Sequence, residues 1–251
     1  MKDNYSSIDK AFLILENLAV PPYEKTALEI SEELKIHRST VHRILNILIE
    51  NKMVHQSPSS KKYSIGPGSY HIGAAYLYNH TSMEQIRIIL EELAKEIKQS
   101  IGYAILLEDR ILSLFELESY QPIQIGFKVG TYYPIHCGAY GKCIMAYYEP
   151  YDRLEEIVYS SNLEKKGPNT ITDPKQLLQE YSSIRQQGFA ISDEENMKGL
   201  VGIGVPVKNF NNKVTACIAV KYIKGNIVDA ERDTILRKLM HYADRISKLN
   251  L

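Results

Sequence analysis

The segment IHRSTVHRILNIL, residues 36–48, combines apolar and cationic side chains in a helical rhythm. An apolar residue recurs every three or four positions, at Val41, Leu45 and Leu48. The opposite face of the same helix is polar and cationic, with Ser39, His42, Arg43 and Asn46. Such a helix, taken alone, is most often a solvated surface helix, so the flanking sequence decides its role.

Two further helices are expected before this segment. Residues 7–20 repeat apolar side chains at helical spacing, and the two prolines that follow end the run because proline cannot continue a helical hydrogen-bond ladder. Thr26 and Glu29 form a capping-box pattern at the start of the second helix. A short connection then leads to the third helix, which begins with Arg38, Ser39 and Thr40. Three helices with a tight turn between the last two are typical of a helix-turn-helix.

A hairpin is expected directly after the third helix. Residues 53–56 and 62–65 have the composition of short strands, and the turn-forming residues SPSS separate them. Lys61 and Lys62 lie near the tip of this hairpin. A basic hairpin in this position predicts the wing of a winged helix-turn-helix.

The charges in this region favour DNA as its partner. Residues 36–62 hold five Lys and Arg residues against one acidic residue, whereas residues 1–35 hold four against seven. The apolar face is expected to dock the third helix onto the first two, and the polar face to enter a major groove, where arginines reach guanine edges or phosphates. The residues expected to contact DNA are Thr26, Arg38, Ser39, Thr40, His42, Arg43, Lys61 and Lys62.

The whole chain has 251 residues, a length that suits two domains, and 44% of them are hydrophobic, as in ordinary globular proteins. No stretch has the length and apolarity of a membrane span, and the N-terminus lacks the layout of a signal peptide. Three cysteines without a CxxC pair argue against a disulfide framework. We expect a cytoplasmic protein with no membrane partner and no cofactor.

The rest of the chain predicts an α+β fold. Residues 66–68, Gly-Pro-Gly, are expected to break regular structure at a domain boundary. A helix over 69–80 is apolar enough to need a partner face, which is either a second copy of the chain or its own domain. Further helices are expected over 82–98, 139–148, 151–160 and 174–187, and strands over 101–107, 111–117, 122–127, 188–192, 201–207 and 214–222. Hairpins at both ends of this pattern favour a largely antiparallel sheet.

Several segments resemble the isocitrate-lyase-regulator (IclR) family of bacterial transcription factors, in the family's order and over nearly the whole chain. They are SIDKAFLILENL, ALEISEELKIHRSTVHRIL, VHQSPSSKKYSIGP, YYPIHCGAYGKCIMAY, GFAISDEENMKGLVGIGVPV and KVTACIAV. The resemblance implies a winged helix-turn-helix DNA-binding domain in residues 1–66, a linker or dimerisation helix in residues 67–80, and a GAF-like effector-binding domain in residues 81–251. Family members commonly have Gly where this chain has Lys35 and Lys61.

The resemblance also implies a function. We expect a sequence-specific DNA-binding transcriptional regulator, a repressor rather than an activator, controlled by a small effector such as an organic acid. It is expected to act as a homodimer or tetramer, because a twofold dimer pairs two recognition helices with two halves of a palindromic operator.

An effector site is expected in the second domain. The resemblance assigns it to Ala139, Tyr140, Gly141, Asp193, Gly202, Cys217, Ala219 and Lys221. Small residues before Lys142 allow the backbone amides of Ala139 and Tyr140 to approach a ligand, although a simple strand-to-helix turn would have the same composition. Lys221 is expected either to pair with an anionic effector or, by preference, to face solvent.

Two other classes of protein remain open. One is a metabolic enzyme acting on a small acid, with chemistry at Cys137 or Asp193 and an N-terminal domain for oligomerisation. The other is a winged-helix module that binds protein. His136 and Cys137 are neighbours on a strand and so point to opposite faces, and the cysteine spacing does not suit zinc. The acidic run 193–195 is expected to be a solvated loop. We therefore predict no catalytic residue and no metal site.

Overall fold

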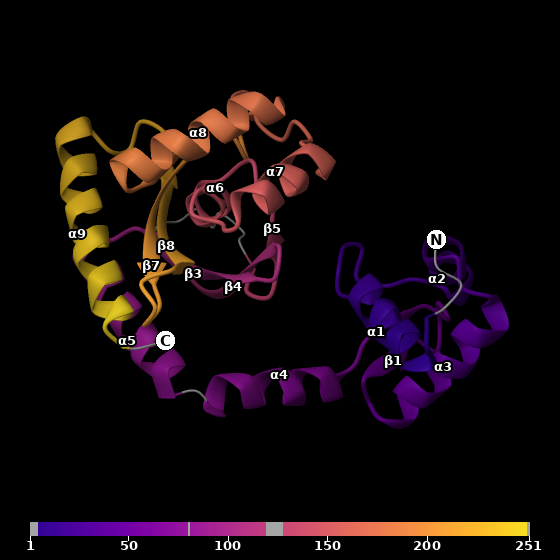
Figure 1. Ribbon diagram of the computed structural model, residues 1–251. Coiled ribbons are helices and arrows are strands. Elements are labelled where there is room, and N and C mark those ends of the chain that lie inside the picture. The colour runs from indigo at the N-terminus through magenta and orange to yellow at the C-terminus, as the bar shows by residue number, and fades with distance from the viewer. Residues whose placement is uncertain (1–4, 80, 119–127, 250–251) are drawn as a thin grey trace. The chain divides into compact units, whose positions relative to one another are not determined.

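The computed structural model describes residues 5–79, 81–118 and 128–249, and the chain divides into two compact units, residues 1–81 and 82–251 (Figure 1). Each unit has a hydrophobic core of its own. In the described ranges, no helix combines the length and the apolarity that crossing a membrane requires.

The first unit contains the winged helix-turn-helix predicted from the sequence. Its elements are α1 (Ser7–Leu18), α2 (Ala27–Leu34), α3 (Arg38–Glu50), β1 (Val54–Gln56), β2 (Tyr63–Ile65) and α4 (Pro67–Asn79). The expected capping box at Thr26 is present, because its hydroxyl accepts from the Glu29 amide while the Glu29 carboxylate accepts from the Thr26 amide. Lys35 ends α2 in the left-handed conformation, with φ 54° and ψ 39°, which turns the chain into α3.

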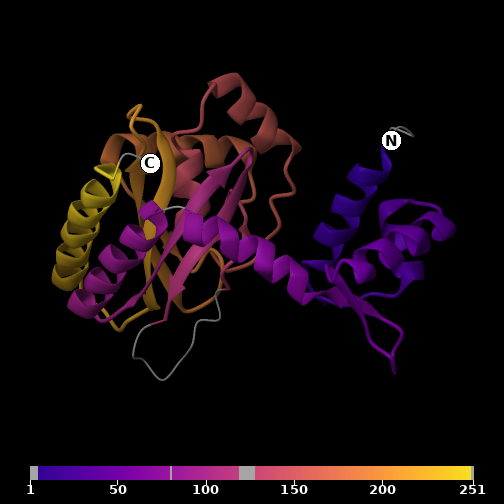
Figure 2. The same cartoon turned by 90° about the horizontal axis from the view of Figure 1, so that it is seen from below.

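The apolar face of α3 fixes the orientation of its cationic face. Val41, Leu45 and Leu48 are buried, together with side chains of α1 and α2 such as Leu18 and Ile30. After α3, the strands β1 and β2 pair antiparallel, and their hairpin extends from the first unit in Figure 2. The polar face of α3 is therefore left outside the core.

Two boundaries in the first unit differ from the sequence expectation. Helix α1 ends at Leu18, ahead of the two prolines instead of at residue 20. Helix α4 begins at Pro67, so Gly66 is the one residue of the expected 66–68 break that lies outside regular structure. Proline is well accommodated in the first turn of a helix, because the amide hydrogen that it lacks would have no partner in the helix there.

In the described part of the chain, the second unit is a six-stranded antiparallel sheet between two layers of helices. Its strands are β3 (Ser100–Leu107), β4 (Arg110–Leu117), β5 (Tyr132–Tyr133), β6 (Ala190–Asp193), β7 (Leu200–Lys208) and β8 (Val214–Ile223), in the order β5-β4-β3-β8-β7-β6. Helices α5 (Thr81–Ile97) and α9 (Asp229–Ser247) cover one face, and α6 (Ala139–Met145), α7 (Tyr151–Ser160) and α8 (Pro174–Gln187) cover the other (Figures 1 and 2). The α+β class and the antiparallel sheet are as predicted.

Several details of the second unit were not predicted correctly. The strand expected from residue 188 begins at Ala190, because Gly188 ends α8 in the left-handed conformation with φ 85°. The helix expected over 139–148 ends at Met145. The strand expected over 122–127 lies outside the described residues. The sequence analysis predicts neither β5 nor α9, although the apolar side chains of α9 recur at helical spacing, at Ile235, Leu239, Tyr242 and Ile246.

Candidate DNA interface and effector pocket

The face of α3 opposite the core carries the predicted DNA contacts. Arg38, Ser39 and Arg43 are exposed, and Thr40 and His42 are half-buried. Arg43 donates a hydrogen bond of 3.2 Å to the hydroxyl of Ser7, the first residue of α1. This bond uses one of the guanidinium donors and leaves the group at the surface, where it can meet an external acceptor.

The start of α3 has a histidine cap that the sequence analysis did not assign. Nδ1 of His37 accepts from the backbone N–H of Ser39 at 3.4 Å and lies 2.8 Å from the Ser39 hydroxyl. Helix N-termini attract anions because their first amides lack partners and the helix dipole is positive there. Arg38 and Ser39 lie in this first turn, so cation, hydroxyl and helix dipole favour the same kind of partner, a phosphate.

The other predicted DNA contacts are Thr26 and Lys62, whose side chains have partners within the chain, and Lys61 at the wing. The Thr26 hydroxyl is engaged in its capping box with Glu29. Lys62 lies 3.0 Å from a carboxylate oxygen of Glu24, and this hydrogen bond raises the pKa of Lys62, so the ammonium stays protonated. Lys61 is exposed in the wing turn, in the left-handed conformation with φ 58°.

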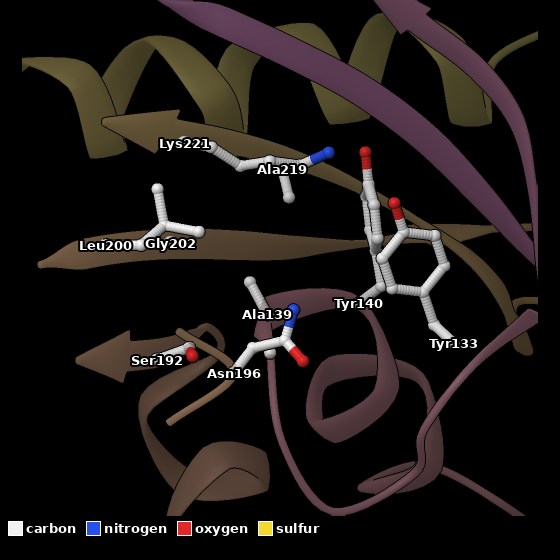
Figure 3. Close-up of a pocket in the computed structure, with 10 residues that line it drawn as sticks. Tyr133, Ala139, Tyr140, Ser192, Asn196, Leu200, Gly202, Ala219 and Lys221 are labelled. Atoms are coloured by element: carbon white, nitrogen blue, oxygen red, sulfur yellow. The ribbon is translucent and has the colours of Figure 1, made fainter. Parts of the chain in front are cut away.

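A pocket in the second unit lies between the sheet and the start of α6 (Figure 3). It is lined by Tyr133, Gly138, Ala139, Tyr140, Ser192, Asn196, Leu200, Gly202, Ala219 and Lys221. Five of the residues predicted for effector binding are among them, namely Ala139, Tyr140, Gly202, Ala219 and Lys221. The cavity volume is about 20 Å³, room for roughly one water molecule, so a larger ligand requires side chains of the wall to move apart.

Glycines on β7 let α6 approach the sheet. A Cβ at Gly202 would lie 3.2 Å from the Cβ of Ala139, and a Cβ at Gly204 would lie 2.9 Å from the Ala139 carbonyl oxygen. The start of α6 therefore rests directly on the strand at this side of the pocket.

One end of the pocket is a buried ion pair. Lys221 donates to Oε2 of Glu116, and their side chains are only 7% and 5% exposed. Glu116 also accepts from the hydroxyls of Ser113, Tyr133 and Tyr140, at 2.9, 3.1 and 3.3 Å. Burial lowers the pKa of Lys221, and Glu116 acts against that shift. The preference for a solvent-facing Lys221 was wrong, because Glu116, far away in the sequence, offers it a carboxylate.

Gly102 makes room for this ion pair. On β3, Gly102 pairs with Glu116 of β4 on one side and with Ala219 of β8 on the other. A Cβ at position 102 would lie 2.0 Å from the Tyr140 hydroxyl oxygen and 2.3 Å from a carboxylate oxygen of Glu116. Glu116 thus reaches across β3 because that position has no side chain.

The acidic run 193–195 is only partly the solvated loop that was expected, because Asp193 is at the surface whereas Glu195 is buried. Glu195 is 7% exposed, and its carboxylate accepts from Lys142 of α6 at 2.6 Å. Lys142 is itself buried and also donates to Glu180 of α8 at 2.6 Å and to the Ile191 carbonyl at 2.7 Å. Burial raises the pKa of Glu195, although Lys142 opposes the shift. This cluster ties α6, α8 and the segment after β6 together.

Three residues predicted for effector binding lie away from the pocket wall. Asp193 forms a surface ion pair with Lys224. Cys217 is buried close to Gly204, where an added Cβ would lie 3.0 Å from its Sγ. Gly141 packs against the backbone of Pro134, whose carbonyl oxygen would lie 1.9 Å from a Cβ. These positions serve surface pairing and packing.

The sequence analysis missed other residues of the pocket, which are Tyr133, Gly138, Ser192, Asn196, Leu200 and the Glu116 carboxylate behind the wall. Strand alternation places Ser192 on the same face of β6 as the buried Ala190, so that residue could have been found. Nothing local marks Tyr133, Asn196 or Glu116, because distant segments of the chain bring them to the pocket.

His136 and Cys137 do not form a reactive pair. The Nε2 atom of His136 lies 2.9 Å from the Glu164 carbonyl oxygen, while the Cys137 thiol lies 3.6 Å from the side-chain oxygen of Asn196. Burial raises the pKa of Cys137 to about 12, so this thiol is not the thiolate that a nucleophile requires at neutral pH. All three cysteines are buried, as expected for core residues.

Family models and curated relatives match both units. The model of the IclR helix-turn-helix domain matches residues 7–58, and the model described as bacterial transcriptional regulator IclR C-terminal matches residues 74–248. The HTH-type transcriptional regulator BhcR of Paracoccus denitrificans is 28% identical over 241 residues, which cover 96% of this chain and 86% of the relative. The HTH-type transcriptional repressor AllR of Escherichia coli is 23% identical over 214 residues, which cover 85% and 79%.

Solved structures share the fold. An IclR transcriptional regulator from Alicyclobacillus acidocaldarius matches with a TM-score of 0.87 and 24% identity, over 99% of this chain and 100% of that one. An IclR homolog from Microbacterium hydrocarbonoxydans, complexed with 4-hydroxybenzoate, matches with a TM-score of 0.76 and 20% identity, over 97% and 100%. With a recognition helix in one unit, a pocket in the other and family models matching both, this chain belongs to the IclR family of bacterial transcriptional regulators, DNA-binding proteins with an effector domain and not enzymes.

Proposed function

We propose that α3 and the wing read an operator sequence and that a small effector in the pocket of the second unit controls this binding. The observation that carries the proposal is the exposed cationic face of α3, which lies opposite a fully buried apolar face. A rigid helix with this distribution can enter a major groove without exposing its core residues.

The proposed DNA contacts differ in kind. Arg38 and Arg43 are suited to guanine edges or phosphates, and Ser39, Thr40 and His42 lie beside them on α3. Lys61 is placed to hold the DNA backbone from the wing. Thr26 and Lys62 would contact phosphates only by giving up or sharing their partners Glu29 and Glu24.

We also propose that the protein works as a homodimer or tetramer on a palindromic operator, in the cytoplasm where its DNA target lies. Large apolar side chains are exposed on the first unit, at Ile8, Phe12, Tyr70, Ile72 and Tyr78. Apolar side chains distributed around α4 are typical of a helix that packs against a partner. A second copy of the chain is the partner that operator symmetry favours.

The regulation that we propose is repression relieved by the effector. The name of AllR, a repressor, supports this direction of control. An effector that prefers the conformation with low operator affinity weakens operator binding. The operator then weakens effector binding by the same factor. An organic acid stays a prediction from the family resemblance, since no contact within the pocket selects an acid.

Replacement of Arg43 tests the proposed DNA interface. Arg43→Ala is expected to weaken operator binding by roughly tenfold or more, since one good base or phosphate contact contributes about 1–3 kcal/mol. The affinity of the unchanged protein should also fall steeply with salt, because phosphate contacts release counterions. Fluorescence anisotropy with the DNA upstream of the protein's own operon measures both effects.

Arg237→Ala is the matched control, since Arg237 is an exposed arginine on α9 of the second unit. Its operator affinity should equal that of the unchanged protein. Equal binding to the upstream DNA and to unrelated DNA would contradict the proposal, as would an Arg43→Ala variant that binds normally. No DNA binding at all would favour the protein-binding winged-helix module.

A further inference from the structure

We propose that the pocket selects an uncharged ligand carrying a hydrogen-bond donor, such as an alcohol or a primary amide, and that Glu116 sets this selectivity. The inference rests on the proposed function of the pocket as the effector site. It departs from the organic acid that the family resemblance implies.

The charge at the polar end of the pocket is already balanced. Among the lining residues that the structure describes, Lys221 is the one with a charged side chain, and Glu116 of the same chain compensates it. Glu118, just beyond β4, places a further negative charge near the same ammonium group. A ligand carboxylate would bring an uncompensated negative charge beside an ion pair whose side chains are buried, which is costly.

The hydrogen bonds at this end of the pocket also favour an uncharged ligand. An ionised carboxylate can only accept, and Glu116 accepts at both oxygens: Ser113 and Tyr133 donate to Oε1, and Tyr140 and Lys221 donate to Oε2. Each tyrosine has a single hydroxyl proton, and Glu116 takes both. The phenol oxygen of Tyr140 therefore offers a lone pair to a ligand, so it favours a group that donates and repels a carboxylate, which cannot.

The rest of the wall is neutral. Figure 3 shows the nitrogen of Lys221 directed toward the hydroxyl ends of Tyr133 and Tyr140, with Ser192 and Asn196 apart from them. A hydroxyl and a carboxamide can each both donate and accept, which suits a second polar group on a neutral ligand. Ala139, Gly202 and Ala219 supply the apolar wall.

Matched ligands test the proposal directly. The probes are 4-hydroxybenzoate, 4-hydroxybenzamide and 4-hydroxybenzyl alcohol, together with lactate, lactamide and 1,2-propanediol. Thermal shift and calorimetric titration of the full chain at pH 7.5 give the binding, because a ligand of the folded state raises the melting temperature. The unchanged protein is expected to respond to amides or alcohols and not to the matching carboxylates.

Glu116→Gln should reverse this preference. The substitution removes the carboxylate that pairs directly with Lys221, so affinity for the carboxylates should rise by about tenfold or more. Glu108→Gln removes the same charge at the exposed turn between β3 and β4 and should change nothing. Because the buried ammonium can destabilise the unit once Glu116 no longer pairs with it, the double variant Glu116→Gln with Lys221→Met removes both charges of the ion pair and is expected to bind no carboxylate.

Three results would overturn the proposal. The first is that the unchanged protein binds a carboxylate as tightly as the matching amide. The second is that folded Glu116→Gln shows no gain in affinity for carboxylates, and the third is that the double variant binds a carboxylate. All of these measurements are made without DNA. If the proposed operator binding failed, the ligand-binding measurements could therefore still be interpreted. If the proposed ligand selectivity failed, an effector of another chemical class could still control DNA binding.

Discussion

At the residue scale, Gly102 shows how a missing side chain shapes the pocket. The hydroxyl of Tyr140 and the carboxylate of Glu116 occupy the space that a Cβ at this position would need. The carbonyl oxygen of Phe115 would lie 2.6 Å from the same Cβ. Since one of these neighbours is backbone, the structure has little freedom to adapt.

Gly102→Ala is therefore expected to destabilise the second unit by about 1–3 kcal/mol or more, as overpacked cores do. Urea unfolding of the full chain measures the loss. Gly73→Ala is the matched control, because a Cβ at Gly73 in α4 meets nothing within 4 Å. Alanine there should raise the stability by up to about 1 kcal/mol, as glycine weakens helices. Equal stability of the two variants would contradict this account of the pocket.

The buried ion pairs of the second unit could not be predicted from the sequence. Lys221 could be assigned to β8 by strand periodicity, yet its burial depends on Glu116, which lies 105 positions away in the chain. Lys142 and Glu195 are another such pair, 53 positions apart. Charged side chains are expected at the surface unless a partner is known, and one sequence does not say which distant segments will meet.

At the scale of elements, the turn between α2 and α3 is decided by one backbone conformation. Lys35 adopts φ 54°, a region that costs a residue with a Cβ on the order of 1 kcal/mol and costs glycine almost nothing. Lysine at this position therefore makes the helix-turn-helix less stable than glycine would in the same backbone conformation.

Lys35→Gly is expected to stabilise the first unit by about 1 kcal/mol, and thermal unfolding measures the gain. Glu32→Gly, at an exposed position within α2, is the matched control and should lower the stability by a similar amount. If Lys35→Gly were as destabilising as the control, the left-handed turn would not be the source of strain.

Element prediction succeeded where the local signals were strong. The ends of α7 and α8 fall at the predicted residues, 151–160 and 174–187. Prolines mark the start of both helices, and a left-handed glycine ends α8. The two-residue strand β5 is too short to leave a periodic signal, whereas α9 has a clear one that the sequence analysis did not use.

At the scale of the whole molecule, the exposed apolar side chains of α4 predict self-association. A double substitution, Ile72→Glu with Tyr78→Glu, is expected to shift the protein to monomers at micromolar concentration, because two charges would be buried in the proposed interface. Sedimentation velocity measures the shift. Tyr159→Glu, at an exposed position on α7, should leave the assembly unchanged. A monomeric unchanged protein would instead indicate that α4 packs within its own chain.

The sequence by itself determined the winged helix-turn-helix, the α+β class of the second unit and the cationic face of α3. Those features follow from side-chain periodicity, capping residues and charge within short segments, all of which are local properties of the chain. Only the tertiary structure decided how the pocket is charged, because Gly102, Glu116, Tyr140 and Lys221 meet through strand register and helix packing. Hydrogen-bond direction and charge balance at a site depend on that meeting, and no local pattern encodes it.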